Sequence, residues 1–350
     1  MAEVTMVCIE AGESAENLDY RTVPSFGVRP IGLLLMFLVG LVECRRDRYD
    51  AVVSFSLIPH GTFALAIGRA WNLPVHLGVI GQDLDVHARA SYGPVIQLLL
   101  KRFDAVSVPG TTHRRQLLNL GVADDRIAIL RNPVDVDRYR PAPDRDEAFD
   151  FVWVGRFQTE KRPRLFLQAL AELHRRGAEF RGVMIGDGPL RSAVTAERAR
   201  LGLEDAVELT GWVEDPLDYY HRSRIFVLTS SRDALPLTLV EAMATGTACI
   251  VPDVGNVTDV AEHGHNALVL DRMSRSSLAT ALERLLGDER LCSRFAANAP
   301  EVRRRYSYEA ASADWAEILG VLRPTEDHEK LAAEPASTSP SADRSRRGDG

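Results

Sequence analysis

Residues 230–246 read SSRDALPLTLVEAMATG, and they follow directly on the apolar run Ile225–Thr229. The apolar run predicts a buried strand that ends at Ser230, and Pro236 is a residue favoured in the first turn of a helix. A strand that passes through a short polar loop into a helix is the repeating unit of a parallel α/β sheet. The N-terminus of such a helix offers free N–H groups and a partial positive charge, which suit a phosphate group.

Two carboxylates of this segment, Asp233 and Glu241, have seven residues between them. One lies in the loop before the helix and the other within the helix, so both can line one crevice. The segment resembles the EX7E motif of retaining nucleotide-sugar glycosyltransferases of family 4, which have the GT-B fold. The resemblance includes the proline, the Glu-Ala-Met-Ala run and the closing glycine, but the first family glutamate is Asp233 here. It implies that Glu241 binds the ribose and that the donor is held by Asp233 and backbone groups of Ala234, Leu235, Leu237 and Thr238.

A second signal is the segment 154-VGRFQTEK-161, in which a strand ends at Gly155, where backbone can approach a ligand closely. Arg156 and Lys161 place two cations in one loop, and two fixed cations can neutralise the charge of a departing diphosphate. The alternative is a solvated pair of surface charges. The segment is similar to the Gly-Arg…Glu-Lys element of the same family, which implies that Arg156 and Lys161 bind the diphosphate.

Weaker elements follow in the family's order. Gly211 and Trp212 stand where the family cradles the nucleobase, and Trp212 either flanks the base or packs in the core. The segment Gly255–Asp259 resembles the family's loop over the donor sugar, with Asp259 in place of the usual glutamate. In the first half of the chain, Asp83 is either a contact to the sugar or acceptor or a loop cap. His60 opens a helix and either reaches the cleft or caps that helix.

Outward from these motifs, strand-like and helix-like segments alternate along nearly the whole chain, which predicts βαβ units around parallel sheets. Proline and charge in Arg131–Asp146 indicate a linker between two such domains. We expect two doubly wound Rossmann-like domains with a cleft between them. The expected division is an acceptor-side domain at 1–134, a donor domain at 135–305, a helix crossing back at 306–323 and a disordered tail at 324–350. Because Glu10–Pro24 is polar and predicts no helix, the first β-α unit of the acceptor-side domain is expected to be missing.

Composition excludes several classes of protein. The formal net charge of −7 gives no indication of nucleic-acid binding, and the four cysteines form no CxxC pair, so we expect neither disulfides nor structural zinc. No secretory signal opens the chain, which predicts a cytoplasmic protein. The apolar run Ile31–Val42 is too short to span a bilayer. It is either a core-packed helix or a helix that touches a membrane surface beside Arg45, Arg46 and Arg48.

The resulting prediction is a retaining, metal-independent glycosyltransferase that moves a sugar from a nucleotide-diphosphate sugar to a glycan, lipid or small-molecule acceptor. Asp233, Arg156 and Lys161 are the predicted catalytic residues, and no metal ligands or cofactors are expected. Two alternatives stay open. One is a nucleotide-sugar-binding protein with impaired catalysis, and the other is a relative such as a nucleotide-sugar epimerase or a sugar phosphorylase.

Overall fold

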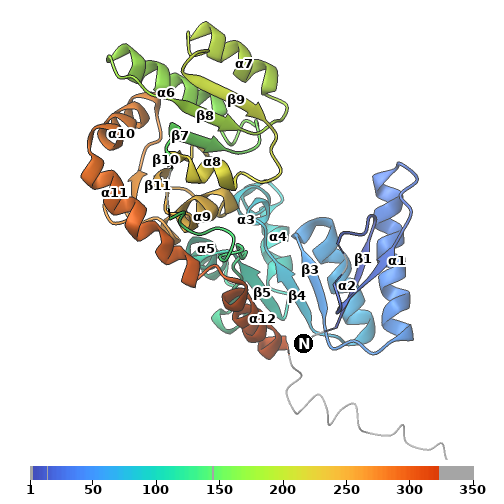
Figure 1. Cartoon of the computed structure of the whole chain (residues 1–350). Coiled ribbons are helices and arrows are strands. Elements are labelled where there is room, and N and C mark those ends of the chain that lie inside the picture. Colours follow the sequence, from blue (N-terminus) through green and yellow to red (C-terminus); the bar gives the residue numbers. More distant parts are fainter. Residues whose placement is uncertain (1–2, 14, 144–145, 323–350) are drawn as a thin grey trace, which may run out of the picture.

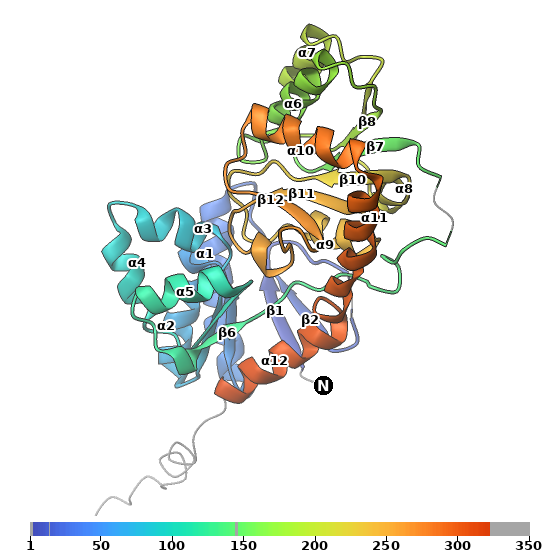
Figure 2. The same ribbon diagram turned by 90° about the vertical axis from the view of Figure 1, so that its left-hand side faces the viewer.

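Two parallel β-sheets form the centres of two halves of the chain, in a computed structural model that describes residues 3–13, 15–143 and 146–322. Figures 1 and 2 show the halves as separate bodies that meet along one face, with the last helix lying against the N-terminal half. The tail predicted at 324–350 lies outside the described residues.

The N-terminal half is built on a four-stranded parallel sheet with the order β3-β4-β5-β6. Its strands are β3 (Val52–Phe55), β4 (Val75–Gly78), β5 (Ala105–Val108) and β6 (Ile127–Ile129). The helices of this half are α1 (Arg29–Arg46), α2 (Thr62–Trp71), α3 (Gln82–Asp85), α4 (Gly93–Leu100) and α5 (Thr111–Asn119). Short helical turns lie at Leu57–Gly61, His87–Arg89 and Asp124–Arg126.

The start of the chain differs from the sequence-based expectation. Strand β1 (Val4–Cys8) pairs in parallel with a second strand, β2 (Leu18–Thr22), which lies within the stretch Glu10–Pro24 that we interpreted as polar and without a helix. The two strands form a sheet of their own. The sequence LDYRT lacks an apolar run, so its strand character comes from pairing with β1 rather than from its own composition.

The C-terminal half contains a six-stranded parallel sheet with the order β12-β11-β10-β7-β8-β9. Its strands are β7 (Phe149–Val154), β8 (Gly182–Ile185), β9 (Val207–Gly211), β10 (Ser223–Val227), β11 (Ala248–Pro252) and β12 (Ala267–Leu270). Its helices are α6 (Pro163–Arg175), α7 (Arg191–Arg200), α8 (Leu217–His221), α9 (Leu237–Ala244), α10 (Arg275–Gly287) and α11 (Glu289–Asn298). Short helical turns lie at Val257–Asp259 and Ala299–Arg304.

Both faces of this second sheet are covered, which explains why strands such as β8, β11 and β12 are continuous apolar runs. Alternate residues of β7 enter different clusters: Phe151 and Trp153 join one core, and Val152 joins the other. The doubly wound architecture predicted from the alternation of segments is therefore confirmed. Sequence reasoning missed α11 and β12.

Two segments of chain connect the halves, and they are bonded to each other. The linker contributes Val134, whose backbone N–H donates to the carbonyl of Tyr306 at 2.8 Å. Beyond Tyr306 the chain enters α12 (Tyr308–Leu322), which packs on strands β4, β5 and β6 (Figure 2). Asp314 of this helix accepts from the backbone N–H of Arg131 at 2.9 Å and pairs with its guanidinium at 2.5 Å. The last helix of the described residues thus lies against the sheet of the N-terminal half.

Candidate functional site

The order of the C-terminal sheet reverses between β7 and β10, which are neighbours although they are far apart in the chain. In doubly wound sheets, ligands bind outside the carboxyl ends of the strands at such a reversal. The loops after these two strands are bonded to each other. Ser231 N–H donates to the carbonyl of Glu160 at 2.7 Å, and the hydroxyl of Thr229 donates to the carbonyl of Lys161 at 2.6 Å. The two strongest sequence motifs therefore meet at one point.

Lys161 and Asp233 are in direct contact at this point: the ammonium of Lys161 forms an ion pair with Oδ2 of Asp233. The same oxygen accepts a hydrogen bond from the hydroxyl of Ser230 at 3.1 Å. The Lys161 side chain is 25% exposed and that of Asp233 is 15% exposed, so both remain accessible to a ligand. Asp233 thus holds the ammonium of Lys161 at the carboxyl ends of β7 and β10, where the order of the sheet reverses.

Arg156 lies in the same loop and is exposed. With the Gln158 amide oriented to satisfy its neighbours, Nε of Arg156 donates to the amide oxygen of that residue at 3.2 Å. The sequence indicated that a ligand can closely approach the backbone of Gly155. In the structure, another loop of the protein lies close to it. A side chain at Gly186, whose φ is +143°, would place its Cβ 1.9 Å from the carbonyl oxygen of Gly155. The loops after β7 and β8 consequently pack backbone to backbone.

Helix α9 begins at Leu237, where the sequence predicted it, with Pro236 at the N-cap position rather than in the first turn. No side chain caps this end of the helix. Leu237 is exposed, and Thr238 and Ala234 are half-buried. Amides at an uncapped helix start carry a partial positive charge and can donate to an anion, and the loop that holds Asp233 leads directly into them.

Glu241 belongs to a second cluster on α9. Its Oε2 accepts a hydrogen bond of 2.9 Å from the hydroxyl of the buried Tyr220. Burial raises the pKa of Glu241 and Asp215 adds to this, while the bond from Tyr220 acts in the opposite direction. Asp215 in turn accepts from the hydroxyl of Tyr139 in the linker at 3.0 Å. Sequence analysis identified Glu241 but missed Tyr139, Asp215 and Tyr220, because no motif contains them.

Gly211 is the last residue of strand β9 at the edge of the same sheet, and Trp212 follows it. Gly211 has a φ of +81°, and its carbonyl accepts from the N–H of Gly186 at 2.8 Å. Trp212 is 71% exposed, so the alternative that it packs in the core is wrong. An exposed indole at the carboxyl end of a strand is free to stack on a ligand.

Asp83 and His60, the two predicted site residues of the N-terminal half, are both at least partly enclosed by the protein. Asp83 is buried, and its two oxygens accept from the N–H groups of Leu57 at 3.0 Å and Ile80 at 3.2 Å. Burial raises its pKa, although these bonds oppose that effect. This geometry fits the loop cap among the two alternatives for Asp83. His60 is half-buried in the turn before α2, and burial, followed by the charge of Arg29, lowers its pKa.

The loops at the carboxyl ends of the two sheets face each other. Gly81, after β4, approaches the loop of Asp233 and Ala234 so closely that a Cβ on it would lie 3.1 Å from Cβ of Ala234. Asp259, in the segment expected to lie over the donor sugar, forms hydrogen bonds to the other half of the chain. It accepts from the backbone N–H of Thr111 at 2.7 Å and from its hydroxyl, at the start of α5 in the other half. Asp259, which stands where the family usually has a glutamate, therefore forms a contact between the halves.

Asn256 is a further residue that joins the halves, and it is fully buried. Its Oδ1 accepts from the N–H groups of Thr112 at 2.9 Å and His113 at 3.2 Å. Its Nδ2 donates to Ala234 O at 3.0 Å and to Nδ1 of His113 at 2.7 Å. Asn256 thus connects the loop of Asp233 and Ala234 to α5.

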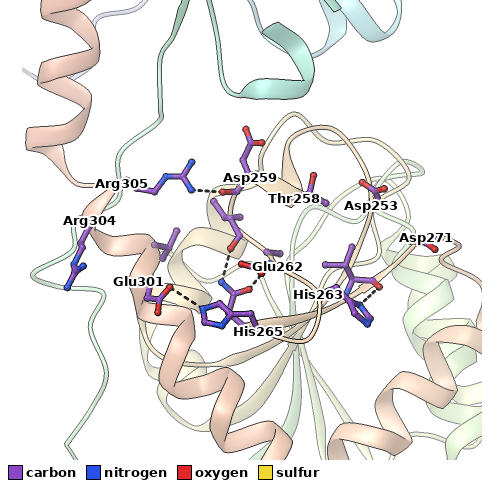
Figure 3. A pocket seen from close by; sticks show the side chains of 15 residues that line it. Asp253, Thr258, Asp259, Glu262, His263, His265, Asp271, Glu301, Arg304 and Arg305 are labelled. Carbon is purple, nitrogen blue, oxygen red and sulfur yellow. Dashed lines mark hydrogen bonds and ion pairs between the residues drawn. The ribbon is translucent and has the colours of Figure 1, made fainter. Parts of the chain in front are cut away.

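A hollow of about 990 Å³ is lined by residues from 253–271 and 301–305, with Asp259 among them (Figure 3). It is lined by acidic side chains together with histidine and arginine, among them Asp253, Asp271, His263 and Arg304. Neither Lys161 nor Asp233 lines it. Within the part of the chain that the structure describes, no three acidic, histidine or cysteine side chains gather to hold a metal ion.

Comparisons with known proteins agree with this arrangement. A family model described as "Glycosyl transferases group 1" matches residues 135–302, and one described as "Glycosyl transferase 4-like domain" matches residues 2–133. An alpha-D-kanosaminyltransferase of Streptomyces kanamyceticus is 32% identical over 175 residues, which are 49% of this chain and 45% of the relative. A UDP-Gal:alpha-D-GlcNAc-diphosphoundecaprenol alpha-1,3-galactosyltransferase of Escherichia coli is 25% identical over 319 residues, 82% and 81% of the two chains. The chain spans half or less of the length of several curated relatives that it matches.

Among solved structures, Anabaena Alr3699/HepE in complex with UDP superimposes with a TM-score of 0.73 at 17% identity, over 87% of this chain and 86% of that one. The apo form of the lipopolysaccharide outer core galactosyltransferase WaaB superimposes with a TM-score of 0.68 at 19% identity, over 87% and 85%. At these identities the likeness establishes the fold.

Proposed function

Because the chain belongs to the group 1 glycosyl transferases and has the GT-B fold, we propose that it transfers a sugar from a nucleotide-diphosphate sugar to an acceptor hydroxyl. The observation that carries the proposal is the meeting of Lys161 with Asp233 at the reversal of the C-terminal sheet, beside the uncapped start of α9. This arrangement offers an ammonium, a carboxylate and free amides to one ligand. A diphosphate joined to a sugar presents the complementary groups.

In the proposed donor complex, the diphosphate lies against Lys161, Arg156 and the first amides of α9, including those of Leu237 and Thr238. Glu241, held by Tyr220, accepts from the ribose hydroxyls. Trp212 and the backbone of Gly211 border the base. Asp233 and the backbone of Ala234 and Leu235 contact the sugar. His60 is proposed on the acceptor side of the cleft.

The proposed reaction is retaining and needs no metal ion. The bond from the anomeric carbon to the diphosphate oxygen breaks, and a bond from that carbon to the acceptor oxygen forms on the same face of the sugar. The acceptor proton passes to the departing phosphate oxygen. Fixed cations and helix amides stabilise the negative charge that develops on the diphosphate.

A thermal-shift panel of UDP-, GDP-, ADP- and TDP-sugars identifies the donor. With that donor, turnover that requires an acceptor supports transfer, and the anomeric configuration of the product, read by NMR, tests retention. Full activity in the presence of EDTA supports metal independence. Binding without turnover on any acceptor would favour the alternative of a nucleotide-sugar-binding protein, and turnover of the donor alone would favour an epimerase.

We also propose that α1 contacts a membrane surface at the cytoplasmic face. One side of this helix exposes Ile31, Leu34, Leu38 and Val42, spaced three and four residues apart. Exposed arginines follow at its C-terminal end, at positions 45, 46 and 48. Within the described residues, no helix is long and apolar enough to cross a bilayer. All four cysteines are free thiols, which supports a reducing compartment.

Sedimentation with vesicles that contain anionic lipid tests this contact. We expect binding that falls with added salt and in the double variant Leu34→Glu, Leu38→Glu. Equal sedimentation of variant and wild-type protein would contradict the proposal.

A further inference from the structure

Asp85 is a carboxylate that the sequence motifs did not identify. It ends the short helix α3, two residues after Asp83, and residues two apart in a helix point to nearly opposite sides. Asp83 points into the protein toward Leu57, whereas the side chain of Asp85 keeps 12% of its surface exposed. Of the two acids in this helix, Asp85 is therefore the one that reaches the space between the halves.

The position of Asp85 relative to the donor-side loop follows from Gly81. The point where a Cβ of Gly81 would lie is 3.6 Å from Oδ2 of Asp85 and 3.1 Å from Cβ of Ala234. Asp85 thus stands directly across the cleft from the loop that we propose to hold the sugar. Burial opposes ionisation of Asp85, but His113, Arg89 and Arg232 outweigh it and lower its pKa, so the group carries a negative charge.

Two buried side chains, His113 and Asn256, support Asp85: Asn256 binds His113, and His113 faces Asp85. The two backbone amides bound to Oδ1 of Asn256 fix the orientation of its amide, so Nδ2 donates to Nδ1 of His113. Nδ1 is then an acceptor, and the ring proton sits on Nε2. Nε2 is fully buried, has no hydrogen-bond partner among the described residues, and lies 3.6 Å from Oδ2 of Asp85. A buried donor left unpaired costs about 1–3 kcal/mol, which favours a shorter distance to Asp85.

From this geometry, and resting on the proposed function, we infer that Asp85 binds a hydroxyl of the donor sugar and that His113 and Asn256 are its positioning residues. A carboxylate suits this task because its two oxygens accept hydrogen bonds from sugar hydroxyls while one of them faces His113. Asp85 and His113 belong to the N-terminal half, and Asn256 belongs to the C-terminal half. The sugar contact is therefore supported only when the halves are closed, which couples recognition of the sugar to closure.

The test compares a nucleoside diphosphate with its nucleotide sugar. Calorimetry measures the affinities of UDP, GDP, ADP and TDP, and of the glucose, galactose and N-acetylglucosamine derivatives of the nucleotide that binds best. The readout is the dissociation constant of the nucleoside diphosphate divided by that of its nucleotide sugar. This ratio isolates the contribution of the sugar to binding. We expect Asp85→Asn to reduce this ratio about tenfold or more while the affinity for the nucleoside diphosphate stays unchanged.

Three variants complete the design. Asp83→Asn is the matched control, because it is the neighbouring buried cap: we expect a lower melting temperature and an unchanged ratio. His113→Phe should lose the contribution of the sugar, and His113→Gln, which keeps an N–H donor, should retain part of it.

An unchanged ratio in Asp85→Asn, with nucleoside diphosphate still bound, would overturn this inference and leave the proposed function standing. Failure of the wild-type protein to bind any of the nucleotides would overturn the proposed function itself.

Discussion

The ammonium of Lys161 and the carboxylate of Asp233 form an ion pair between the loops that follow two adjacent strands, β7 and β10. In the chain these strands are separated by two other strands, so only the sheet order brings the two residues together. The pair is partly exposed, and its main consequence is to aim one positive charge at the carboxyl edge of the sheet.

We expect Lys161→Ala to reduce transfer by at least about a hundredfold, because one of the charges that stabilise the departing diphosphate is removed. The free energy of unfolding should fall by only about 1 kcal/mol, since a partly exposed ion pair contributes little. Turnover and urea denaturation measure the two effects. Lys101→Ala, an exposed lysine of the N-terminal half, is the control. Wild-type turnover in Lys161→Ala would refute the assigned role.

The hydrogen bond from Tyr220 to Glu241 should govern how nucleotide affinity depends on pH. Burial raises the pKa of Glu241, and the bond from Tyr220 partly opposes this rise. The ionised carboxylate accepts from ribose hydroxyls, so affinity should fall as the pH drops through this raised pKa. In Tyr220→Phe the opposing bond is lost, and the decline should begin at a higher pH. Calorimetry between pH 5 and 8 measures the profile, and identical profiles for Tyr220→Phe and the neighbouring Tyr219→Phe would contradict the assignment.

A pair of glycine variants separates backbone strain from displacement of the donor-side loop. Gly255 has a φ of +56°, and a Cβ there would lie 1.7 Å from the carbonyl oxygen of Asp233. Gly264 has a φ of +79° with nothing within 4 Å of its Cβ position. Both alanine variants should lose about 1–2 kcal/mol from the left-handed conformation. Only Gly255→Ala should also lose transfer, and thermal melting together with turnover distinguishes the two effects. Equal activity of the two variants would show that the loop tolerates displacement.

His76 should make the N-terminal half sensitive to acid. The ring is fully buried and lies 5.4 Å from that of Trp315 on α12. Burial lowers its pKa from 6.5 to about 4. Below pH 6.5, His76 is therefore protonated in the unfolded chain, but it stays neutral in the folded chain until the pH approaches 4. The stability contributed by the neutral ring is present above pH 6.5 and is lost as the pH falls toward 4.

The expected loss at this residue is about 2 kcal/mol between pH 7 and pH 5. Urea denaturation followed by tryptophan fluorescence at both pH values measures it. His76→Gln should be less stable at pH 7 but lose less on acidification. An equal loss in the variant and the wild-type protein would exclude His76 as the cause.

The sequence predicted the donor-side half well because its signals are local. Strands β7 and β10 are largely apolar and each leads into a turn, and Lys161, Asp233 and the start of α9 occur within or directly after these turns. Strand β2 escaped prediction because its sequence has no apolar run. Trp212 was ambiguous because an indole suits a core as well as a binding surface, and only the fold shows that it is exposed.

The contacts between the halves could not be predicted. Asn256 and His113 are separated by 143 residues in the chain, and their hydrogen bond exists only because the start of α5 faces the loop after β11. His113 lies in no recognised motif, and the motif-like segment Gly255–Asp259, which contains Asn256, does not indicate a partner in the other half. For the same reason Asp83 attracted attention instead of Asp85: the side on which each acid lies is set by packing against Leu57, which the local sequence does not encode.

The pairing of Val134 with Tyr306, beside the pairing of Arg131 with Asp314, has a mechanical consequence. A single connecting segment would allow one half to rotate in any direction relative to the other, whereas two connecting segments restrict this rotation. They permit rotation about the line that joins them and resist rotation about other axes. The two connections therefore restrain the halves to one relative register, the register in which Asn256 and Asp259 meet α5.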